Sequence, residues 1–468
     1  MKIEFILYIL LFSSIYVTGQ EVLTLEQCRR LAIENNKTLK IASVKIQMAE
    51  QERKAARTKF FPQLSAAGTY IHNQKDLELI DYNDLSLSSS LLSALAPVLQ
   101  TMPELAQALQ TTGDNIKNAT HLDFRNVWIG DISFVQPVFM GGKIIAYNQI
   151  ANYAEELAKS MNNMQLSEVI YRTDEVYWQI VSLENKKKLA DKYVEMLTKT
   201  DNDITAMINE GIATRVDGLS VKVKLNEAEM AQTKVNNGLA LSRMLLAQIC
   251  GLELTLPIKP ADEDAGQISF NEQAAFPDIN AAFSNRQELR SLELATKIYK
   301  KKENIVMAEM LPNVAFTANY IVTNPNTFYG YKNEFAGMYN FGVAVKVPLS
   351  GWWEGMHKKN SARAGTLIKT LEIEEAREKI ELQVNQSVYK VNEAGKQLNV
   401  SKRNMEKAEE NLRFADLGFK EGIIPTLNLM EAQTAWFAAR SQLIDAQIEL
   451  KLAKVYLDKA LGKPGIEE

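Results

Sequence analysis

FPQLSAAGTY, at residues 61–70, returns as LPNVAFTANY at residues 311–320. In both stretches a proline is followed by alternating larger and smaller side chains up to a tyrosine, and the Pro-to-Tyr spacing is the same. Proline is a helix breaker, and alternation with a period of two is typical of a strand with one apolar face. The pair therefore predicts a helix that stops near Pro62 and another near Pro312, each followed by a β-strand.

Further matches extend this likeness along the chain. Asn35 and Leu39 correspond to Asn285 and Leu289 at the same offset of about 250 residues. QPV at 136–138 matches VPL at 347–349, EGI at 210–212 matches EGI at 421–423, and Gly251 matches Gly462, all at an offset of about 211. Several matches in two fixed registers predict an internal duplication, with about 39 extra residues in the first copy.

The duplication predicts the organisation of the chain. Ahead of the repeats, residues 1–19 are expected to form a signal peptide, since they have a charged start, an apolar core and a cleavage site near Gly19. The alternative is a membrane anchor, for which the apolar core is short. The first repeat, 20–260, contains a helix at 25–58, strands at about 61–73 and 126–138, and a helical hairpin at 143–250. Thr24 and Gln27 have the spacing of a capping box at the start of this helix. The second repeat, 261–468, contains a helix, strands at about 313–323 and 338–348, and a hairpin at 355–461. The hairpins turn at Gly211 and Gly422.

Each of the four predicted strands has an apolar face and a small or polar face. A soluble sheet with one wet face is the simple alternative. If the strands span a membrane they must close into a barrel, because lipid tolerates no open sheet edge. Four strands are too few for a barrel, so the chain is expected to pool its strands with copies of itself.

The helical hairpins also need partners. Their long helices would run near 100 Å at about 1.5 Å per residue, and each has an apolar stripe that must be buried. A ring of them makes a tube.

Several motifs, in this order, resemble the TolC-like outer-membrane efflux protein family along almost the whole mature chain. They are LTLEQC at 23–28 with Asn35-Asn36, FPQL at 61–64, QPVFMGGK at 136–143 and GFKEGIIPTLN at 418–428. The resemblance implies a mainly α fold with a β-barrel portion, in which four strands per chain contribute to a twelve-stranded trimeric barrel that continues as an α-helical tunnel. It implies a passive exit duct of a tripartite efflux or type I secretion system in the outer membrane. The implied partners are a periplasmic adaptor protein and an inner-membrane pump of RND or ABC type.

The resemblance also implies three sets of functional residues. The adaptor is expected at the hairpin tips: Gly211, Ile212, Thr214, Asp217, Gly422, Ile423, Pro425 and Asn428. Candidates for a periplasmic gate are charged residues near the tips: Asp201, Asp203, Glu210, Arg413, Asp416 and Glu421. Aromatic residues expected at the membrane interface are Trp128, Tyr320, Tyr339, Trp352 and Trp353. For each charged residue the alternative is a solvated helix surface.

Two departures from the family pattern stand out. Trp352-Trp353 takes the place of the Gly pair after the fourth strand, and Pro425 and Asn428 stand where the first tip has Thr214 and Asp217. The tips are therefore unequal. The apolar insertion at about 74–125 predicts one or two short helices of unassigned role.

Composition narrows the function further. The formal net charge is −4 without a basic field, which speaks against nucleic-acid binding. No catalytic motif and no metal-ligand spacing is present, so we expect no enzyme, no cofactor and no metal site. Cys28 and Cys250 are expected to be small buried apolar residues. The competing hypotheses are a structural coiled-coil protein of the periplasm or cell surface and, within the duct class, a metal-ion exporter.

Overall fold

The structure, a computed structural model, describes residues 21–78, 89–264 and 276–463. The expected signal peptide at 1–19 lies outside these residues. The chain divides into two compact units, of which the first holds residues 1–51, 152–298 and 365–468, and the second residues 52–151 and 299–364. Both units contain residues from both predicted repeats.

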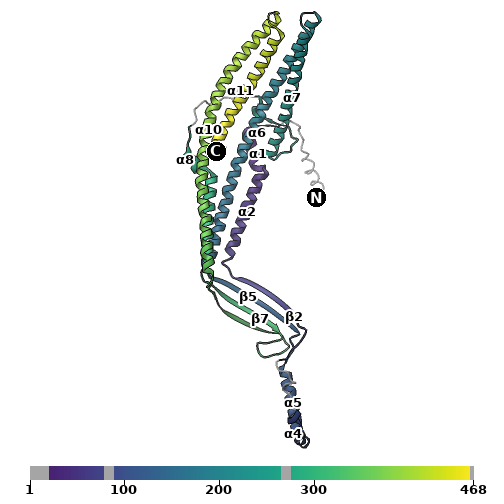
Figure 1. Cartoon of the computed structure of the whole chain (residues 1–468), viewed down its shortest axis with the longest axis vertical. Coiled ribbons are helices and arrows are strands. Elements are labelled where there is room, and N and C mark those ends of the chain that lie inside the picture. The colour runs from purple at the N-terminus through teal and green to yellow at the C-terminus, as the bar shows by residue number, and fades with distance from the viewer. Residues whose placement is uncertain (1–20, 79–88, 265–275, 464–468) are drawn as a thin grey trace, which may run out of the picture. The chain divides into compact units, whose positions relative to one another are not determined.

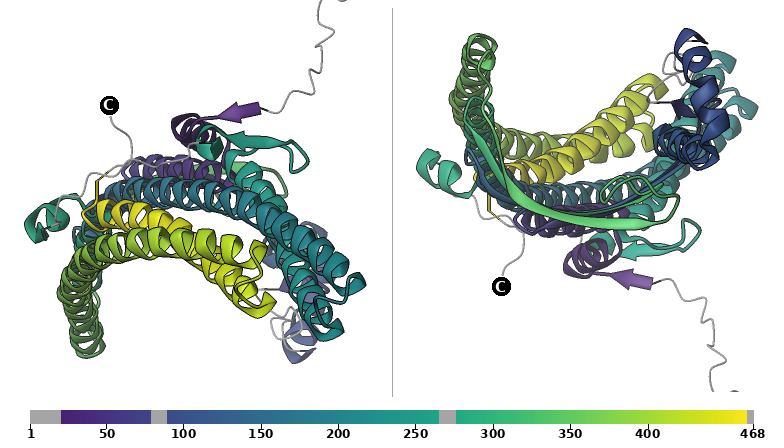
Figure 2. Two further views of the ribbon diagram at one scale, coloured as in Figure 1. Left: turned by 90° about the horizontal axis from the view of Figure 1, so that it is seen from above. Right: turned by 90° about the horizontal axis from the view of Figure 1, so that it is seen from below.

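Long helices dominate the first unit (Figure 1). α6 (Lys143–Asn209) turns into α7 (Arg215–Cys250), and α10 (Gly351–Lys420) turns into α11 (Thr426–Ala460). Within the unit the helices lie side by side and curve together (Figure 2). The hairpins were predicted at 143–250 and 355–461, so α10 starts earlier than expected, at Gly351. No helix in the described ranges combines the length and the apolar character needed to cross a membrane.

The predicted start of the first helix is confirmed, and its predicted continuity is wrong. Thr24 and Gln27 form a capping box at the start of α1 (Leu25–Asn35). The expected single helix from 25 to 58 is interrupted at Asn36, after which α2 (Lys37–Thr58) begins. The Asn36 side chain accepts a hydrogen bond from the Thr38 N–H at 2.8 Å and donates one to the Ile249 carbonyl at 3.0 Å. These side-chain bonds compete with the helical pattern and fix the break.

The second half of the chain repeats this interruption. α8 (Ile279–Asn285) is followed by Arg286 and then by α9 (Gln287–Ala308). Arg286 anchors the junction, because its guanidinium donates to the carbonyls of Lys459 and Ala460 and to the Gln383 side chain. α2 and α9 both end shortly before Pro62 and Pro312, as predicted.

The main core of the first unit lies where α1, α6 and α7 pack together. Its largest fully buried side chains include Tyr177, Ile180 and Leu246. Burying an aliphatic side chain of this size stabilises the fold by about 1.5–3 kcal/mol. Short strands β1 (Glu21–Leu23) and β6 (Ile258–Pro260) pair in parallel beside this core. They tie the segment before α1 to the segment that follows α7.

An antiparallel sheet forms the centre of the second unit. Its order is β2 (Gln63–His72), β5 (Asn126–Met140), β7 (Asn313–Asn324) and β8 (Ala336–Lys346). Strands were predicted at about 61–73, 126–138, 313–323 and 338–348. The sheet is visibly curved (Figure 2). Because β5 pairs with β7, the two halves of the chain meet in the middle of the sheet.

The apolar insertion contains two helices in its described part. α4 (Ser89–Thr101) contains Pro97, and α5 (Pro103–Thr120) begins at Pro103. Proline is well suited to the first position of a helix, since the N–H that it lacks has no helical partner there. β3 (Leu77–Glu78) and β4 (His121–Leu122) pair at the base of the insertion. Residues 79–88 of the predicted insertion lie outside the described residues.

Candidate functional site

The strand register places apolar side chains of all four strands on one face of the sheet. Tyr70 lies opposite Trp128, Ile132 opposite Tyr320, and Tyr320 opposite Tyr339. The same register aligns Ala318 with Phe341. This is the face that alternation predicts, and its assignment is confirmed. Its exposed large side chains are Leu64, Tyr70, Trp128, Ile132, Phe316, Tyr320, Tyr339, Phe341, Val343 and Val345.

The opposite face is more polar, although Ile71, Ile129 and Met338 are also exposed on it. It carries a hydrogen-bonded row that sequence reasoning missed. Ser133 donates to the Asn319 side-chain oxygen at 2.8 Å, and the Asn319 amide donates to Asn340 at 2.9 Å. The row crosses β5, β7 and β8 because these residues stand opposite one another in the register. Alternation predicted that these positions share a face, but only the register brings them within hydrogen-bonding distance.

Both outer strands of the sheet keep an open edge. Among the described residues, β2 pairs only with β5, and β8 pairs only with β7. The outer backbone N–H and C=O groups of β2 and β8 thus lack a strand partner within the described part of the chain. Such edges demand another strand or water.

The aromatic residues predicted for the membrane interface are exposed. Tyr70 and Trp128 lie 4.5 Å apart between ring centroids, and the Tyr70 hydroxyl donates to Asn126. The Tyr320 ring covers Gly337, where a Cβ would lie 2.3 Å from the Tyr320 hydroxyl oxygen. Trp352 and Trp353 stand exposed in the first turn of α10. Tyr70 is also exposed, beside Trp128, and was not among the predicted residues, although it closes the 61–70 motif.

The two hairpin tips turn by the same backbone device. Gly211 has φ +76° and Gly422 has φ +71°, the left-handed conformation that glycine adopts without strain. At the first tip the N–H of Ile212 bonds to the carbonyl of Met207 at 2.8 Å, and at the second the N–H of Ile423 bonds to that of Gly418 at 2.8 Å. Both are Schellman turns, which satisfy the last carbonyls of α6 and α10.

The tips differ in how the following helix starts. Thr214 and Asp217 form a capping box at the start of α7. The hydrogen bonds from Thr214 lower the pKa of the Asp217 carboxyl, which stays ionised at the positive helix N-terminus. α11 starts after Pro425 without any side-chain cap. The predicted inequality of the tips is therefore seen in their capping.

Apolar packing joins the two tips. Ile204 of α6, Val221 of α7, Phe419 of α10 and Leu429 of α11 belong to one buried cluster. Ile212 and Ile423, by contrast, are exposed at 71% and 76%. The structure therefore brings both predicted tips together and leaves one isoleucine at each tip uncovered.

A second set of contacts, also missed from sequence, ties α6 to α11. The Gln433 amide donates to the Thr200 hydroxyl at 3.0 Å, and both residues are buried. The rings of Tyr193 and Phe437 stack with centroids 4.4 Å apart. These partners lie more than two hundred residues apart in the chain, and no local pattern announces them.

The gate candidates have different surroundings. Asp416 is paired with Lys420 at 2.5 Å within α10, and this hydrogen bond, with a smaller effect of Asp203, raises the pKa of Lys420. The Arg413 guanidinium lies over the Phe414 ring. Asp201 has one buried carboxylate oxygen without a hydrogen-bond partner among the described residues. Asp203, Glu210, Arg413 and Glu421 are exposed.

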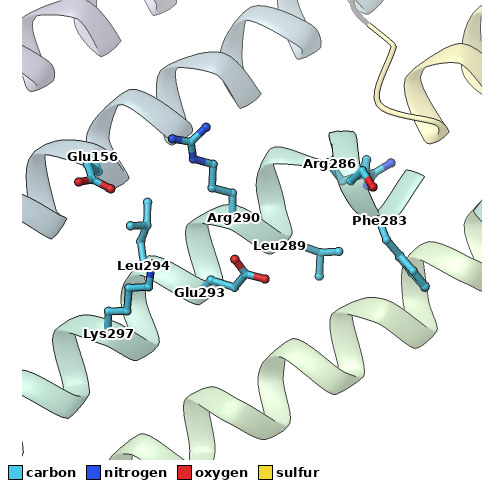
Figure 3. Close-up of a pocket in the computed structure, with 9 residues that line it drawn as sticks. Glu156, Phe283, Arg286, Leu289, Arg290, Glu293, Leu294 and Lys297 are labelled. Carbon is cyan, nitrogen blue, oxygen red and sulfur yellow. The ribbon is translucent and has the colours of Figure 1, made fainter. Parts of the chain in front are cut away.

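A cavity of about 400 Å³ lies in the first unit beside α6, α8 and α9 (Figure 3). Its lining is mostly charged, with Arg286, Arg290, Glu293 and Lys297 from the α8–α9 segment and Glu156 from α6. Pockets for small organic ligands are mainly apolar, so the lining does not suggest such a ligand. Within the described residues, no group of three or more His, Cys, Asp or Glu side chains is placed to hold a metal ion.

Comparison with solved structures finds the same fold in several outer-membrane channels. The outer-membrane channel OprN is 13% identical, with a TM-score of 0.74 over 94% of this chain and 89% of that chain. The outer membrane protein VceC of Vibrio cholerae is 13% identical, with a TM-score of 0.71 over 94% and 96%. The open state of the MtrE outer membrane channel of Neisseria gonorrhoeae is 15% identical, with a TM-score of 0.71 over 94% and 89%. At these identities the likeness shows the fold alone.

The family comparison covers most of the sequence. The model of the outer membrane efflux protein family matches residues 29–252 and 279–463, which include both hairpins and all four strands of the sheet. The comparison with curated proteins gives no match. The family is one of efflux proteins rather than enzymes, and it does not favour the structural coiled-coil hypothesis. The chain belongs to the outer membrane efflux protein family, and it is an efflux channel of the outer membrane.

Proposed function

We propose that three copies of the chain close a twelve-stranded barrel in the outer membrane. The two-faced sheet with two open edges carries this proposal. Barrel strands that span a membrane alternate apolar side chains toward lipid with polar side chains toward the lumen. The face with Tyr339, Phe341 and Val343 suits lipid, and the row formed by Ser133, Asn319 and Asn340 suits a wet lumen.

The open edges support the trimer. In lipid every backbone group needs a partner, so an uncovered strand edge cannot persist there. Pairing β8 of one chain with β2 of the next would satisfy both edges and continue the antiparallel sheet. One chain has four such strands, which is below the smallest known barrels at about eight, whereas three chains supply enough.

The helical hairpins of the trimer would form a tunnel through the periplasm, and the duct itself would be passive. In this proposal each chain is an internal duplication with repeats at 20–260 and 261–468. Two pairs of matching features support the duplication. Schellman turns occur at Gly211 and Gly422, and Gly251 lies against Asn35 as Gly462 lies against Asn285.

The tips would dock a periplasmic adaptor, which links the duct to an inner-membrane pump of RND or ABC type. Exposed Ile212 and Ile423 offer each tip an apolar contact, flanked by the turn glycines. The different caps at Thr214–Asp217 and Pro425–Asn428 suit unequal adaptor contacts. Tripartite efflux and type I secretion both fit this arrangement.

The gate proposal rests on charge near the tips. In a trimer the same residue of each chain would form a ring of three like charges, which attracts counter-ions in the tunnel and repels ions of its own sign. The candidates for such rings are Asp201, Asp203, Glu210, Arg413, Asp416 and Glu421. Asp416 is partly neutralised by Lys420, so the exposed carboxylates of Asp203, Glu210 and Glu421 are the better candidates.

Aromatic belts form at the two membrane interfaces of a barrel. The residues that would lie there are Trp128, Tyr320, Tyr339, Trp352 and Trp353.

The test is the conductance of the detergent-purified protein in a planar bilayer, with its mass measured in the same preparation. A trimer that forms discrete channels is expected. A soluble monomer or dimer without channels would overturn the barrel and leave the coiled-coil hypothesis.

A further inference from the structure

The fold brings together the two cysteines of the chain. Cys28 in α1 and Cys250 at the end of α7 are 222 residues apart in sequence, and both are fully buried. The Cys250 thiol lies 3.5 Å from the Cys28 carbonyl oxygen. The hydrogen bond with the Cys250 side chain, which is the larger cause, and burial both raise the pKa of the Cys28 thiol. The expectation of two separate buried apolar residues missed this contact.

Contacts on both sides hold the two cysteines in place. On one side β1 pairs with β6, with Leu23 opposite Pro260. On the other side the Asn36 amide donates to the Ile249 carbonyl, and Gly251 packs so closely on Asn35 that a Cβ would lie 2.5 Å from the Asn35 Cβ. The start of α1 and the end of α7 are thus fixed relative to each other independently of the cysteines.

The second half of the chain makes the same junction without cysteines. Gly462 lies against Asn285, as Gly251 lies against Asn35. At offsets of about 250 and 211 residues, the positions that correspond to Cys28 and Cys250 are occupied by Asp278 and Leu461. The junction therefore does not require sulfur for packing. Two cysteines in a chain of 468 residues, in contact at this junction, call for a reason beyond filling space.

The compartment supplies that reason. An outer-membrane protein folds after export, in the periplasm, where disulfides form and persist. We propose that Cys28 and Cys250 form a disulfide in the exported protein. In this reaction a thiolate of one cysteine attacks the disulfide of an exported thiol oxidase and gives a mixed disulfide. The second thiolate then attacks the sulfur of the first cysteine and displaces the oxidase, so two electrons pass to the oxidase, which takes up the two protons that the cysteines release and leaves as a dithiol.

Burial fixes when this bond forms. Neither thiol is accessible in the folded chain. Burial also disfavours the charged thiolate, which is the reactive species, so buried thiols are poor nucleophiles. Oxidation must therefore occur before or during the docking of α1 onto α7. Once formed, the bond is shielded from reductants and joins the two ends of a segment that includes β2, β5 and α6.

Thiol labelling of the natural protein tests the proposal. Outer membranes are quenched in acid, denatured and treated with a polyethylene-glycol maleimide, with or without prior reduction. We expect no labelled band without reductant and a band with two labels after reduction. A non-reduced tryptic digest should join the peptide that ends at Arg29 to the peptide that begins at Met244, at a mass lower by two hydrogen atoms. Two labels without reduction, in protein recovered from the outer membrane, would overturn the disulfide while leaving the channel function intact.

Single variants show whether the bond lies within one chain. In Cys28→Ala and in Cys250→Ala the remaining thiol should take one label without reduction. A blocked thiol in either variant would mean that the cysteines bond to other molecules, and the proposal would fall. As a second readout, reductant added during thermal unfolding should lower the unfolding temperature of the wild type but not that of Cys28→Ala/Cys250→Ala. Equal responses of the two proteins would also contradict the bond.

Discussion

Gly251 illustrates how a single residue fixes the junction between α1 and α7. It ends α7 with φ +70°, and it touches Asn35 at a distance that no Cβ tolerates. Gly211 has a similar φ of +76°, but nothing lies within 4 Å of the place where its Cβ would be. A side chain at Gly211 would therefore strain only the backbone, whereas a side chain at Gly251 would also clash with Asn35.

We expect Gly251→Ala to destabilise the protein more than Gly211→Ala. Backbone strain at a left-handed residue costs about 1–2 kcal/mol in both variants. The clash with Asn35 adds about 1–3 kcal/mol in Gly251→Ala alone, since the packed junction must shift. Thermal unfolding of the detergent-purified proteins, followed by circular dichroism, measures the difference. Equal unfolding temperatures would show that the junction yields easily.

The ion pair between Arg29 and Asp174 predicts a pH effect at the same junction. The Arg29 guanidinium holds both carboxylate oxygens, at 2.7 and 2.5 Å, and the Asp174 side chain is 2% exposed. Burial raises the pKa of Asp174, and Arg29 opposes that rise. Replacing Arg29 by methionine leaves the buried carboxylate with only the weaker influence of Lys451. Removing one partner of a buried ion pair costs about 3–5 kcal/mol when the remaining group is charged.

Arg29→Met should therefore lose more stability at about pH 8 than at about pH 5. The pKa of Asp174 rises further in the variant, so the folded state binds a proton that the unfolded state releases. Stability then falls as the pH rises from the ordinary carboxyl value of 3.8 through the raised folded pKa. The unfolding temperature of the variant relative to wild type, measured at both pH values, checks this. Adding Asp174→Asn should remove the pH dependence, and its persistence would point to another group.

At the scale of the element, strand β8 can show which face of the sheet meets lipid and which meets water. Val343 and Ala344 are neighbours on β8 and are both exposed in the single chain. Val343 lies on the apolar face opposite Phe316, and Ala344 lies on the polar face opposite Ala315. The pair offers two lysine substitutions that differ in little but the face of the sheet.

Val343→Lys should reduce the amount of assembled protein in the outer membrane, and Ala344→Lys should be tolerated. A lysine on the lipid face of a barrel costs about 2–4 kcal/mol at the middle of the bilayer, whereas a lumen position stays in water. Trimer yield in outer-membrane fractions, compared by gel without heating, measures the effect. Equal yields would argue against the assignment of the faces.

The elements also show what sequence could predict. The alternation in LPNVAFTANY predicted the apolar face of β7, because a period of two fixes the side on which each residue lies. The Pro residues and the tip glycines marked helix ends, since these residues act on the local backbone. The break at Asn36 escaped, because one of the two hydrogen bonds that fix it is made to Ile249, more than two hundred residues away. The contact of Cys28 with Cys250 and the bond from Gln433 to Thr200 escaped for the same reason.

At the scale of the whole molecule, the two halves of the chain share one sheet. β2 and β5 come from the first half, β7 and β8 from the second, and the β5–β7 pairing joins them. The outermost strands are consequently the first and the last of the four. In the proposed trimer β2 of one chain must lie beside β8 of its neighbour, because these two strands carry the open edges of the four-stranded sheet.

Cysteine cross-linking across that edge should give covalent trimers. The cross-linking variants carry Cys28→Ala and Cys250→Ala, so that no natural thiol interferes, together with Ala66→Cys on β2 and one cysteine on β8 at Phe341, Val343 or Val345. These positions all lie on the apolar face, so at least one pair should come within disulfide range when the strands meet. Mild oxidation of outer membranes should then yield bands of two and three chains on non-reducing denaturing gels, which reductant removes. Ala66→Cys alone should give none. If no pair cross-links although the protein is present in the outer membrane, β2 and β8 do not meet between chains, and the closed trimeric barrel is wrong.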